Sequence, residues 1–457
     1  MSKTLCSLLI LFACLIPPLG ATEYYVDSRN GSDEAAGTSE SQAWQSLAKV
    51  NAVDFQPGDV VRFVRGGLWR GSLKPKSGTS DKPVTYTSYG TSDLPKPRFY
   101  GSKPLNRVTD WKKVESLLWR TVEPVTESTR LTYSDVGNLI FDGHRAGVKC
   151  RKKEQLETEG CFWFEPESRC VWLVSADNPA EICREIEAAL RPYVIDLNNA
   201  HHVVFSDFDV RYGGSHGFGG SGNSHITIRH CDISWIGGGH QNIGTDGVPV
   251  DYVRFGNGIE FWSNAHDHLV ENCRLWEIYD AALTNQGNGK NEQRNITYRN
   301  NVIWNCEYSF EYWNRNEESI TDNIVFTHNT CFNAGYGWGH TQRPDPNGRH
   351  LMFYDTTATT TNFVVTHNVF AHATDSVLRI GNRQQTADFS LDDPNRHLLG
   401  VAWAKQLVMD HNVWHQQPGD DRILVLWRSK LFNDLEFHDF SEYQEKTGLD
   451  RNTVYQP

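Results

Sequence analysis

The stretch Thr366-His-Asn-Val-Phe decides the fold of this chain, because variants of it return along the second half of the sequence. The variants are Arg229-His-Cys-Asp-Ile, Glu271-Asn-Cys-Arg-Leu, Arg299-Asn-Asn-Val-Ile, Thr327-His-Asn-Thr-Cys and Asp410-His-Asn-Val-Trp. Their third residues form a column with spacings of 42, 28, 28, 39 and 44 residues: Cys231, Cys273, Asn301, Asn329, Asn368 and Asn412. A repeat near 28 residues that tolerates insertions predicts a β-solenoid.

Each repeat predicts one strand-turn-strand coil of that solenoid. β-branched runs such as Ile226-Thr-Ile and Phe363-Val-Val supply the strands, and no coil can bury its apolar side alone. Coils stacked at about 4.8 Å share one core and align equivalent residues in ladders. Asn tolerates left-handed backbone, and its amide can bond to the Asn above it. We therefore expect Asn301, Asn329, Asn368 and Asn412 to stack at one turn.

A second column of short strands follows the first by about ten residues. Strand side chains alternate between faces, so placing the apolar residues inward sends a set of polar ones outward. The inward residues are Ile259, Leu283, Phe310, Leu378 and Leu424; the outward ones are Glu260, Thr284, Glu311 and Arg379, with Trp262, Gln286 and Trp313 two positions later and Asp280, Glu307 and Asp375 four positions earlier. The coil around residue 280 also has a second alignment, counted from the Asn column, which pairs Asp280 with Tyr308.

The outward face has two interpretations. A charged face is most simply a solvated surface. The Glu-x-Trp pair at Glu260 and again at Glu311 argues against this, because exposed Trp is costly on an idle surface. An indole ring can cover the apolar face of a pyranose, so Trp262 and Trp313 beside carboxylates favour sugar binding. The alternative for the two tryptophans is packing under a loop.

Composition agrees with a large extracellular β protein. The 457 residues allow a substantial core, and 37 glycines with 12% aromatic residues fit many tight turns and stacked ladders. The formal net charge of −12 disfavours nucleic acid and anionic membranes as partners, so neither is expected. It also counts mildly against a polyanionic substrate, although a local basic patch can override the global sign.

The N-terminus predicts a signal peptide at residues 1–21. Lys3 precedes an apolar run from Leu5 to Ile16, and Leu19-Gly-Ala offers small residues for cleavage before Thr22. Leu11-Phe-Ala-Cys also resembles a lipoprotein signal, but plain secretion, or export to the periplasm, is the preferred prediction. We expect the mature protein to have no membrane anchor and to be a monomer.

Four further parts follow the signal peptide. Residues 22–107 read as the start of the solenoid, 108–190 as an inserted β subdomain, 191–428 as the main coils and 429–457 as a C-terminal cap with a helix.

Eight cysteines remain after the signal peptide, in a compartment that permits disulfides. Cys150, Cys161, Cys170 and Cys183 cluster in one segment, which predicts local disulfides. Cys231 and Cys273 share the ladder column, where either a bridge or a stack of buried thiols fits. Cys306 and Cys331 are expected in the core.

The opening of the chain carries a family resemblance. Tyr24-Tyr-Val-Asp, Pro57-Gly-Asp-Val-Val-Arg-Phe and Gly66-Gly-Leu-Trp-Arg, with the later coil Gly256-Asn-Gly-Ile-Glu-Phe-Trp, resemble secreted bacterial right-handed parallel β-helix enzymes of the pectate-lyase-like superfamily. The resemblance implies an all-β, right-handed parallel β-helix and a polysaccharide or oligosaccharide substrate. That superfamily contains both hydrolases and lyases. The polygalacturonase motifs are not met here, because only Thr245-Asp-Gly comes near one.

The preferred function is a glycoside hydrolase. Such an enzyme needs two carboxyl groups facing across the bond, and it needs no cofactor. Glu311 with Glu260 or Asp280 is the predicted pair, and Glu307 is expected to tune it. Packing these acids together should raise at least one pKa, as a general acid requires.

Two alternatives remain open. A polysaccharide lyase would use the acids as Ca²⁺ ligands and Lys290 or Arg379 as the base. A non-catalytic glycan-binding solenoid would use Trp262 and Trp313 but leaves the dense acids unexplained.

Long insertions flank the outward face at 238–253, 287–294, 341–349 and 382–400. Insertions on one side of a solenoid usually build the walls of its binding face. His216, His240, His340 and Arg343 lie in or near these walls and are predicted, with Trp262, Trp313 and Arg379, to bind substrate. His328, His367 and His411 form a separate column and are expected to be a turn ladder.

Overall fold

The computed structural model describes residues 20–126, 128, 134–251, 253–354, 356–382, 406–416, 423–429 and 435–457. Two predictions fall mostly outside this part of the chain: the signal peptide at 1–21 and the insertion at 382–400. The described residues form a right-handed parallel β-helix, as predicted. None of the helices in these ranges is long and apolar enough to cross a membrane.

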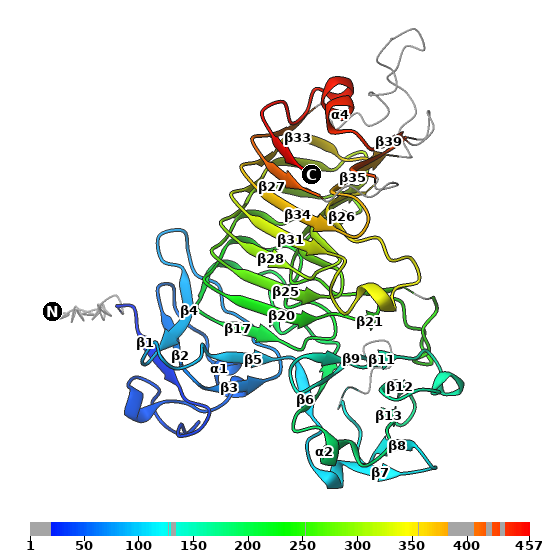
Figure 1. Ribbon diagram of the computed structural model, residues 1–457. Helices are drawn as coiled ribbons and strands as arrows, with labels where there is room; N and C mark the ends of the chain where they lie inside the picture. The colour runs from blue at the N-terminus through cyan, green and yellow to red at the C-terminus, as the bar shows by residue number, and fades with distance from the viewer. Residues whose placement is uncertain are drawn as a thin grey trace, which may run out of the picture.

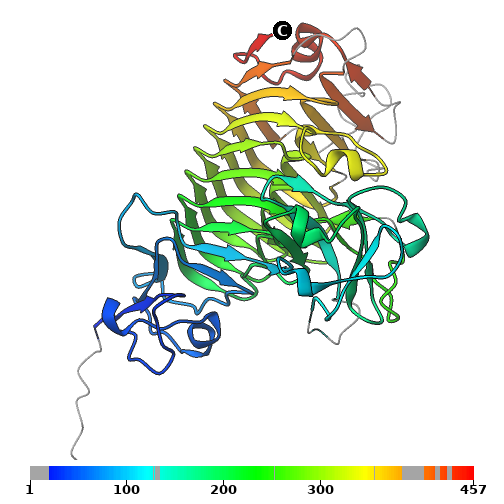
Figure 2. The ribbon, with the colours of Figure 1, turned by 60° about the horizontal axis from the view of Figure 1, so that its bottom comes forward.

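Three long sheets, here named I, II and III, run along the described part of the molecule (Figures 1 and 2). Sheet I has the order β1 (Glu23–Val26), β2 (Val60–Val64), β4 (Val84–Tyr89), β16 (His201–Ser206), β19 (Ser224–Arg229), β24 (His266–Glu271), β27 (Glu292–Arg299), β30 (Ile320–Thr327), β33 (Thr359–Thr366) and β36 (Leu407–Asp410). Sheet II has the order β3 (Leu68–Arg70), β5 (Arg98–Tyr100), β17 (Asp209–Arg211), β20 (Asp232–Ile236), β25 (Arg274–Ile278), β28 (Val302–Trp304), β31 (Thr330–Ala334), β34 (Val369–Ala373), β37 (Val413–His415) and β40 (Val454–Gln456). Sheet III has the order β15 (Ile195–Asp196), β18 (Phe218–Gly219), β23 (Ile259–Trp262), β26 (Ala281–Asn288), β29 (Tyr308–Arg315), β32 (Arg349–Phe353), β35 (Leu378–Asn382), β38 (Val425–Ser429) and β39 (Leu435–Phe437).

The inward side chains of the three sheets form one core that runs from Val26 to Tyr443. Parallel pairing keeps equivalent residues in line; Ile296, Ile324 and Phe363, for example, occupy one position on three neighbouring strands. Each fully buried side chain of this kind contributes about 1.5–3 kcal/mol. No coil is stable by itself, so the stack is held by burial between neighbours.

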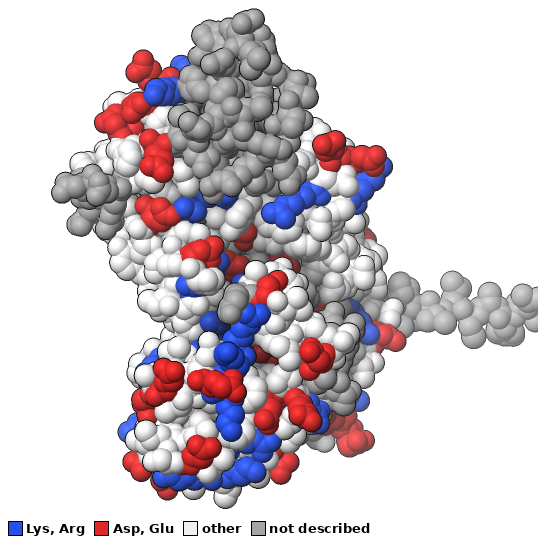
Figure 3. Space-filling model, turned by 90° about the vertical axis from the view of Figure 1, so that its right-hand side faces the viewer, with Lys and Arg blue, Asp and Glu red and all other residues white. Residues whose placement is uncertain are grey.

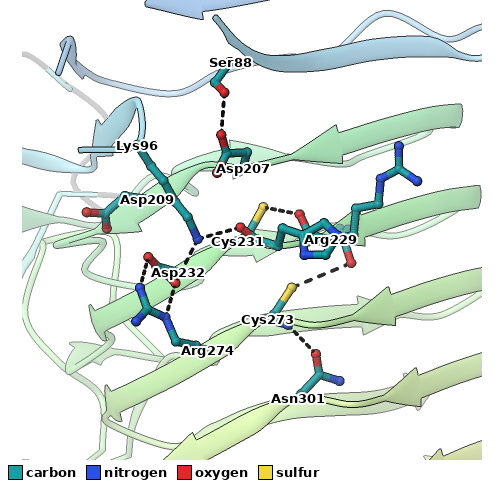
Figure 4. Close-up of polar contacts among 12 residues, drawn as sticks. Ser88, Lys96, Asp207, Asp209, Arg229, Cys231, Asp232, Cys273, Arg274 and Asn301 are labelled. Atoms are coloured by element: carbon teal, nitrogen blue, oxygen red, sulfur yellow. Dashed lines mark hydrogen bonds and ion pairs between the residues drawn. The ribbon is translucent and has the colours of Figure 1, made fainter. Parts of the chain in front are cut away.

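The asparagine column forms the predicted ladder at the turn between sheets I and II. The side-chain oxygens of Asn329, Asn368 and Asn412 each accept the backbone N–H of the Asn one coil before, at 3.0, 2.8 and 2.9 Å. Figure 4 shows where the column begins: the backbone N–H of Cys273 donates to Asn301 Oδ1 at 2.9 Å. The buried amides satisfy backbone donors that the turn would otherwise leave unpaired.

The inserted unit lies beside the lower coils in Figure 1 and projects forward in Figure 2. One sheet contains β6 (Ser102–Pro104), β9 (Val136–Phe141), β10 (Arg145–Ala146) and β14 (Ile186–Leu190); the other contains β7 (Trp111–Lys113), β8 (Leu118–Thr121), β11 (Val148–Lys149), β12 (Cys161–Glu165) and β13 (Cys170–Val174), with the helix α2 (Pro179–Ile182) nearby. This unit has its own apolar core, built around Phe141, Phe162 and Ile186.

Helices occur at both ends of the solenoid. α1 (Leu47–Ala52) is capped by the Ser46 hydroxyl, which accepts the N–H of Lys49 at 3.1 Å. α4 (Phe440–Thr447) is the predicted C-terminal helix; Asp439 caps its start, and Gly448 ends it with a φ of 71°. Phe440 and Tyr443 pack against Trp414, so α4 covers the last coil of the core.

The eight cysteines of the described chain are buried free thiols, so the local disulfides predicted for Cys150, Cys161, Cys170 and Cys183 are corrected. Cys150 and Cys161 share a small cluster, but Cys183 lies in the other core of the inserted unit. The Cys170 thiol donates to a carbonyl within its own hairpin. In the ladder column, a disulfide bridge and a stack of buried thiols were both possible for Cys231 and Cys273. The structure has the stack of thiols, each of which donates a hydrogen bond to a carbonyl.

Candidate functional site

The outward residues of sheet III lie in the predicted register. Glu260 pairs with Thr284, which pairs with Glu311, and Trp262, Gln286 and Trp313 form the row two positions later. Ala281 pairs with Tyr308, which places Asp280 beside Glu307 and excludes the alternative alignment with Tyr308. β32 inserts Met352 between Glu311 and Arg379, a position that the column alignment did not contain.

This face forms the floor of a cavity of about 700 Å³. Seven predicted residues line it: Glu260, Asp280, Glu311, Trp262, Trp313, His216 and Arg343. Glu307, His340, Arg379 and His240 are not among the lining residues. Figure 3 looks onto the side where β21 (Gly239–His240), β26 and β35 lie, and shows Lys and Arg side chains in a band down its lower half. Asp and Glu side chains lie on both sides of this band.

Glu260 is a buried carboxyl held by two donors. Its Oε2 accepts the Asn257 side-chain amide at 2.9 Å and lies 3.1 Å from His216 Nε2. His216 Nδ1 accepts the backbone N–H of Asn257 at 3.0 Å, so the ring proton sits on Nε2 and points at Glu260. Burial lowers the pKa of His216 to about 3, which keeps the ring neutral. Burial raises the pKa of Glu260 to about 7, and the charge of Asp280 adds to the shift.

Glu311 lies two strands from Glu260 on the same face, which corresponds to Cα atoms about 9–10 Å apart. Its Oε2 accepts the side-chain amide of Gln286 at 2.7 Å. Burial raises the pKa of Glu311 well above its ordinary value, and the carboxyls of Asp280 and Glu260 raise it further. Glu311 is therefore the acid in this cavity that is best placed to hold a proton at neutral pH.

Asp280 is the acid with a cationic partner. Arg343 Nη1 lies 3.1 Å from Asp280 Oδ1 and also donates to the Tyr279 carbonyl at 3.1 Å. Burial raises the pKa of Asp280, Arg343 opposes that shift, and Glu307 adds to it. The direct ion pair favours an ionised Asp280 opposite a protonated Glu311.

Glu307 anchors a wall of the cavity. Its Oε1 accepts the backbone N–H of Asn347 at 2.8 Å, and its Oε2 lies 3.0 Å from His340 Nδ1. Both partners belong to the 335–348 loop between β31 and β32, which also carries Arg343. Glu307 and His340 thus hold this loop, and through it Arg343, against the floor.

The tryptophans line one end of the cavity. Trp262 and Trp313 meet edge to face, with ring centroids 5.3 Å apart, and both are partly exposed. Arg315 lies over Trp313 at 4.9 Å, so this end offers aromatic surface beside a cation.

Arg379 and His240 are predicted site residues that do not line the cavity. Arg379 packs against the Tyr354 ring at 4.7 Å, and it is Tyr354 that reaches the cavity. The backbone N–H of His240, in β21, donates to Asp135 of the inserted unit at 2.7 Å. Burial lowers the pKa of His240 to about 3.

Arg254 is a site residue that sequence reasoning missed. It lies in β22 (Arg254–Phe255), lines the cavity and donates to Gly238 O at 2.7 Å, Gln342 Oε1 at 3.0 Å and Gly137 O at 3.2 Å. It therefore joins the 238–253 loop, the 335–348 loop and the inserted unit. Arg254 lies outside the repeated columns of the sequence, so periodicity gave no indication of its role.

Among the comparisons with known proteins, one solved structure supports the fold. No family model matches the chain. A segment of 81 residues, 17% of this chain, is 43% identical to a lacto-N-biosidase of Bifidobacterium longum subsp. longum, and it spans only 5% of that protein. A solved glycoside hydrolase is 11% identical over 94% of this chain and 99% of its own, with a TM-score of 0.53. A GH136 lacto-N-biosidase from Eubacterium ramulus is 12% identical over 95% of this chain and 67% of its own, with a TM-score of 0.43. The structural neighbours include glycoside hydrolases and a pectate lyase with parallel β-helix folds.

Proposed function

We propose that this chain is a secreted or periplasmic glycoside hydrolase that acts on an oligosaccharide or polysaccharide as a monomer. One observation carries the proposal: three electrostatically coupled acids, Glu260, Asp280 and Glu311, lie on the floor of a cavity that has two tryptophans at one end. The 81-residue similarity to a lacto-N-biosidase supports a carbohydrate substrate.

In this proposal Glu311 is the general acid. Its raised pKa keeps a proton available for the leaving-group oxygen, while Gln286 orients the carboxyl. Asp280 or Glu260 is the nucleophile or base. The cation of Arg343 favours a carboxylate at Asp280. The two donors at Glu260 also stabilise a carboxylate, but burial still raises its pKa to about 7, which makes Asp280 the better supported of the two.

The lyase alternative is less well supported by the positions of its proposed bases. Lys290 pairs with Glu318 at 3.1 Å, and both side chains are more than two-thirds exposed. Arg379 packs on Tyr354 and is not a lining residue. A purely glycan-binding role would leave the three coupled acids without a purpose.

Product analysis on a panel of neutral and sulfated polysaccharides and oligosaccharides tests the proposal. A hydrolase releases a plain reducing end, which is the expected result. An unsaturated product that absorbs in the near ultraviolet would identify a lyase, and binding without any release would identify a glycan-binding protein. Glu311→Gln is the matched control, because it should release almost nothing from the glycan that the wild type cleaves.

A further inference from the structure

A histidine-rich corner lies where the strands β16, β19 and β24 of sheet I begin, and none of its residues lines the cavity. His202, His225 and Asp267 occupy equivalent positions on β16, β19 and β24, because His201 pairs with Ser224 and Ser224 with His266. All three have left-handed backbone, with φ of 54°, 54° and 60°. Such a conformation is uncommon outside glycine and asparagine, so the fold holds these side chains in one direction.

The same ladder position carries asparagine in the next three coils. Asn295, Asn323 and Asn362 follow Asp267 in register and have φ of 55°, 55° and 50°. Asn323 donates its amide to Asn295 Oδ1 at 3.0 Å, and Asn295 donates to Asp267 Oδ1 at 2.8 Å. An amide ladder is thus the ordinary solution here. On β16, β19 and β24, the three strands before these in the sheet, imidazoles and a carboxylate take its place, and both are metal-binding groups.

The distances within the corner suit a metal ion. Asp267 Oδ2 lies 2.7 Å from His266 Nδ1 and 3.5 Å from His225 Nε2. One ligand atom from each of His225, His266 and Asp267 lies within 4.8 Å of the other two. In a tetrahedral site with bonds of about 2.0–2.1 Å, neighbouring ligand atoms are about 3.3 Å apart. Small rotations of these side chains, of which His225 is exposed and the other two partly buried, close this difference.

Two neighbours orient the group. The Asn295 amide occupies Asp267 Oδ1 and so directs Oδ2 toward the histidines. The His202 ring lies 4.1 Å from the His225 ring and limits its rotation. Outer contacts of this kind are what hold metal ligands in position.

We propose that His225, His266 and Asp267 form a binding site for one divalent transition-metal ion of the Zn²⁺ class. Two imidazoles and one carboxylate are suitable ligands for Zn²⁺, whereas Ca²⁺ and Mg²⁺ require oxygen ligands. The site joins β19 to β24 and follows Trp262 by four residues along the chain, at the corner next to the candidate active site. It is independent of the proposed hydrolase chemistry.

Titration calorimetry with ZnCl₂ on tag-free, chelator-treated full-length protein tests the site. The wild type should bind one saturable equivalent, and CaCl₂ should not compete. His225→Ala and His266→Ala should each weaken binding by about 100-fold or more, because loss of even an outer contact costs 10–100-fold. His328→Ala is the matched control: His328 is also exposed, has a left-handed φ of 56° and stacks on His367.

Cobalt substitution gives a second readout that does not depend on affinity. Co²⁺ should produce a visible absorption band in the wild type and in His328→Ala, and no such band in His225→Ala. The proposal is overturned if the wild type shows no saturable Zn²⁺ binding, if His225→Ala binds as tightly as the wild type, or if His328→Ala loses binding equally. Unchanged thermal melting of the metal-free variants confirms that they are folded.

Discussion

At the scale of single residues, the surroundings of each acid decide its protonation. Glu260 has a neutral histidine and an amide as donors, Asp280 has Arg343, and Glu311 has the amide of Gln286 and two neighbouring carboxyls. Three identical chemical groups thus acquire different proton affinities within one cavity. Acid and base roles on neighbouring carboxyls depend on such differences.

Burial of Glu260 predicts a pH-dependent gain in stability on replacing it. Its pKa is about 7 in the fold against an ordinary 4.5, so the folded state binds this proton more tightly than the unfolded state. The resulting stabilisation is complete below about pH 4.5 and is lost as pH rises through about 7. The side chain introduced by Glu260→Gln cannot ionise. At pH 8 this variant should therefore have a higher melting temperature than the wild type, and its free energy of unfolding should be greater by up to roughly 3 kcal/mol.

Melting curves at pH 8 and pH 5 check this. The gain should shrink at pH 5, where the wild type is protonated as well. Glu318→Gln, at an exposed acid paired with Lys290, is the control and should show no such dependence. A gain for Glu260→Gln of the same size at both pH values would contradict the argument.

Trp313 should contribute to substrate binding more than to turnover. Its partly exposed ring lines the cavity beside Trp262, and an aromatic stacking contact is worth about 0.5–1.5 kcal/mol. Trp313→Ala should therefore raise KM by up to about tenfold with little change in kcat. Steady-state kinetics provide the measurement. Trp304→Ala, at an outward Trp of sheet II, should leave KM unchanged.

At the scale of elements, the turn column shows how one residue type repeats a structural role. Asn368 Oδ1 accepts both the backbone N–H and the side-chain amide of Asn329, and its own amide donates to Phe326 O. Each coil therefore supplies the hydrogen-bond partners of the previous one.

Asn368→Ala should destabilise the protein by roughly 2–4 kcal/mol, because it leaves the buried N–H of Asn329 without an acceptor. Urea unfolding measures the loss. Asn301→Cys is the comparison variant and should cost less, since it only extends the thiol segment of Cys231 and Cys273 by one coil. An Asn368→Ala variant as stable as the wild type would show that the ladder is not stabilising.

The column and the register of sheet III were predictable because a solenoid repeats them. Asn301 and Asn412, or Glu260 and Glu311, differ by whole coils, so counting positions places them in line. Arg254 and Tyr354 belong to no repeat and reach the cavity from irregular segments, which sequence periodicity does not describe. The predicted disulfides were wrong, because all four cysteines are free thiols. Proximity in sequence brought Cys150 and Cys161 into one cluster but left Cys183 in the other core of the inserted unit.

At the scale of the whole molecule, the inserted unit and the loops complete a site whose floor belongs to the solenoid. Asp135 binds Lys149 within the inserted unit at 2.7 Å and also accepts the backbone N–H of His240. Arg254 adds a bond to Gly137, and Gln342 one to Gly147. The cavity walls are thus docked on the inserted unit by polar contacts.

Asp135→Asn should destabilise the folded protein by about 3–5 kcal/mol, because it leaves the buried ammonium of Lys149 without its counterion. Burial already lowers the pKa of Lys149 to about 8. Adding Lys149→Met should recover much of the loss, since the introduced amide still accepts the His240 N–H and this pair no longer buries a charge. Urea unfolding of both variants tests this prediction. A double variant with a lower free energy of unfolding than Asp135→Asn alone would contradict it.

The most direct test of the central claim is the dependence of Glu311→Gln on the leaving group. A general acid matters when the departing oxygen needs a proton, and its loss then costs about 10²–10⁴-fold in rate. We predict a loss of that size on the natural glycan and a much smaller loss on a glycoside of the same sugar with an acidic phenol as leaving group. Equal losses on both substrates, or near-normal turnover on the glycan, would contradict the assignment of Glu311 as the acid.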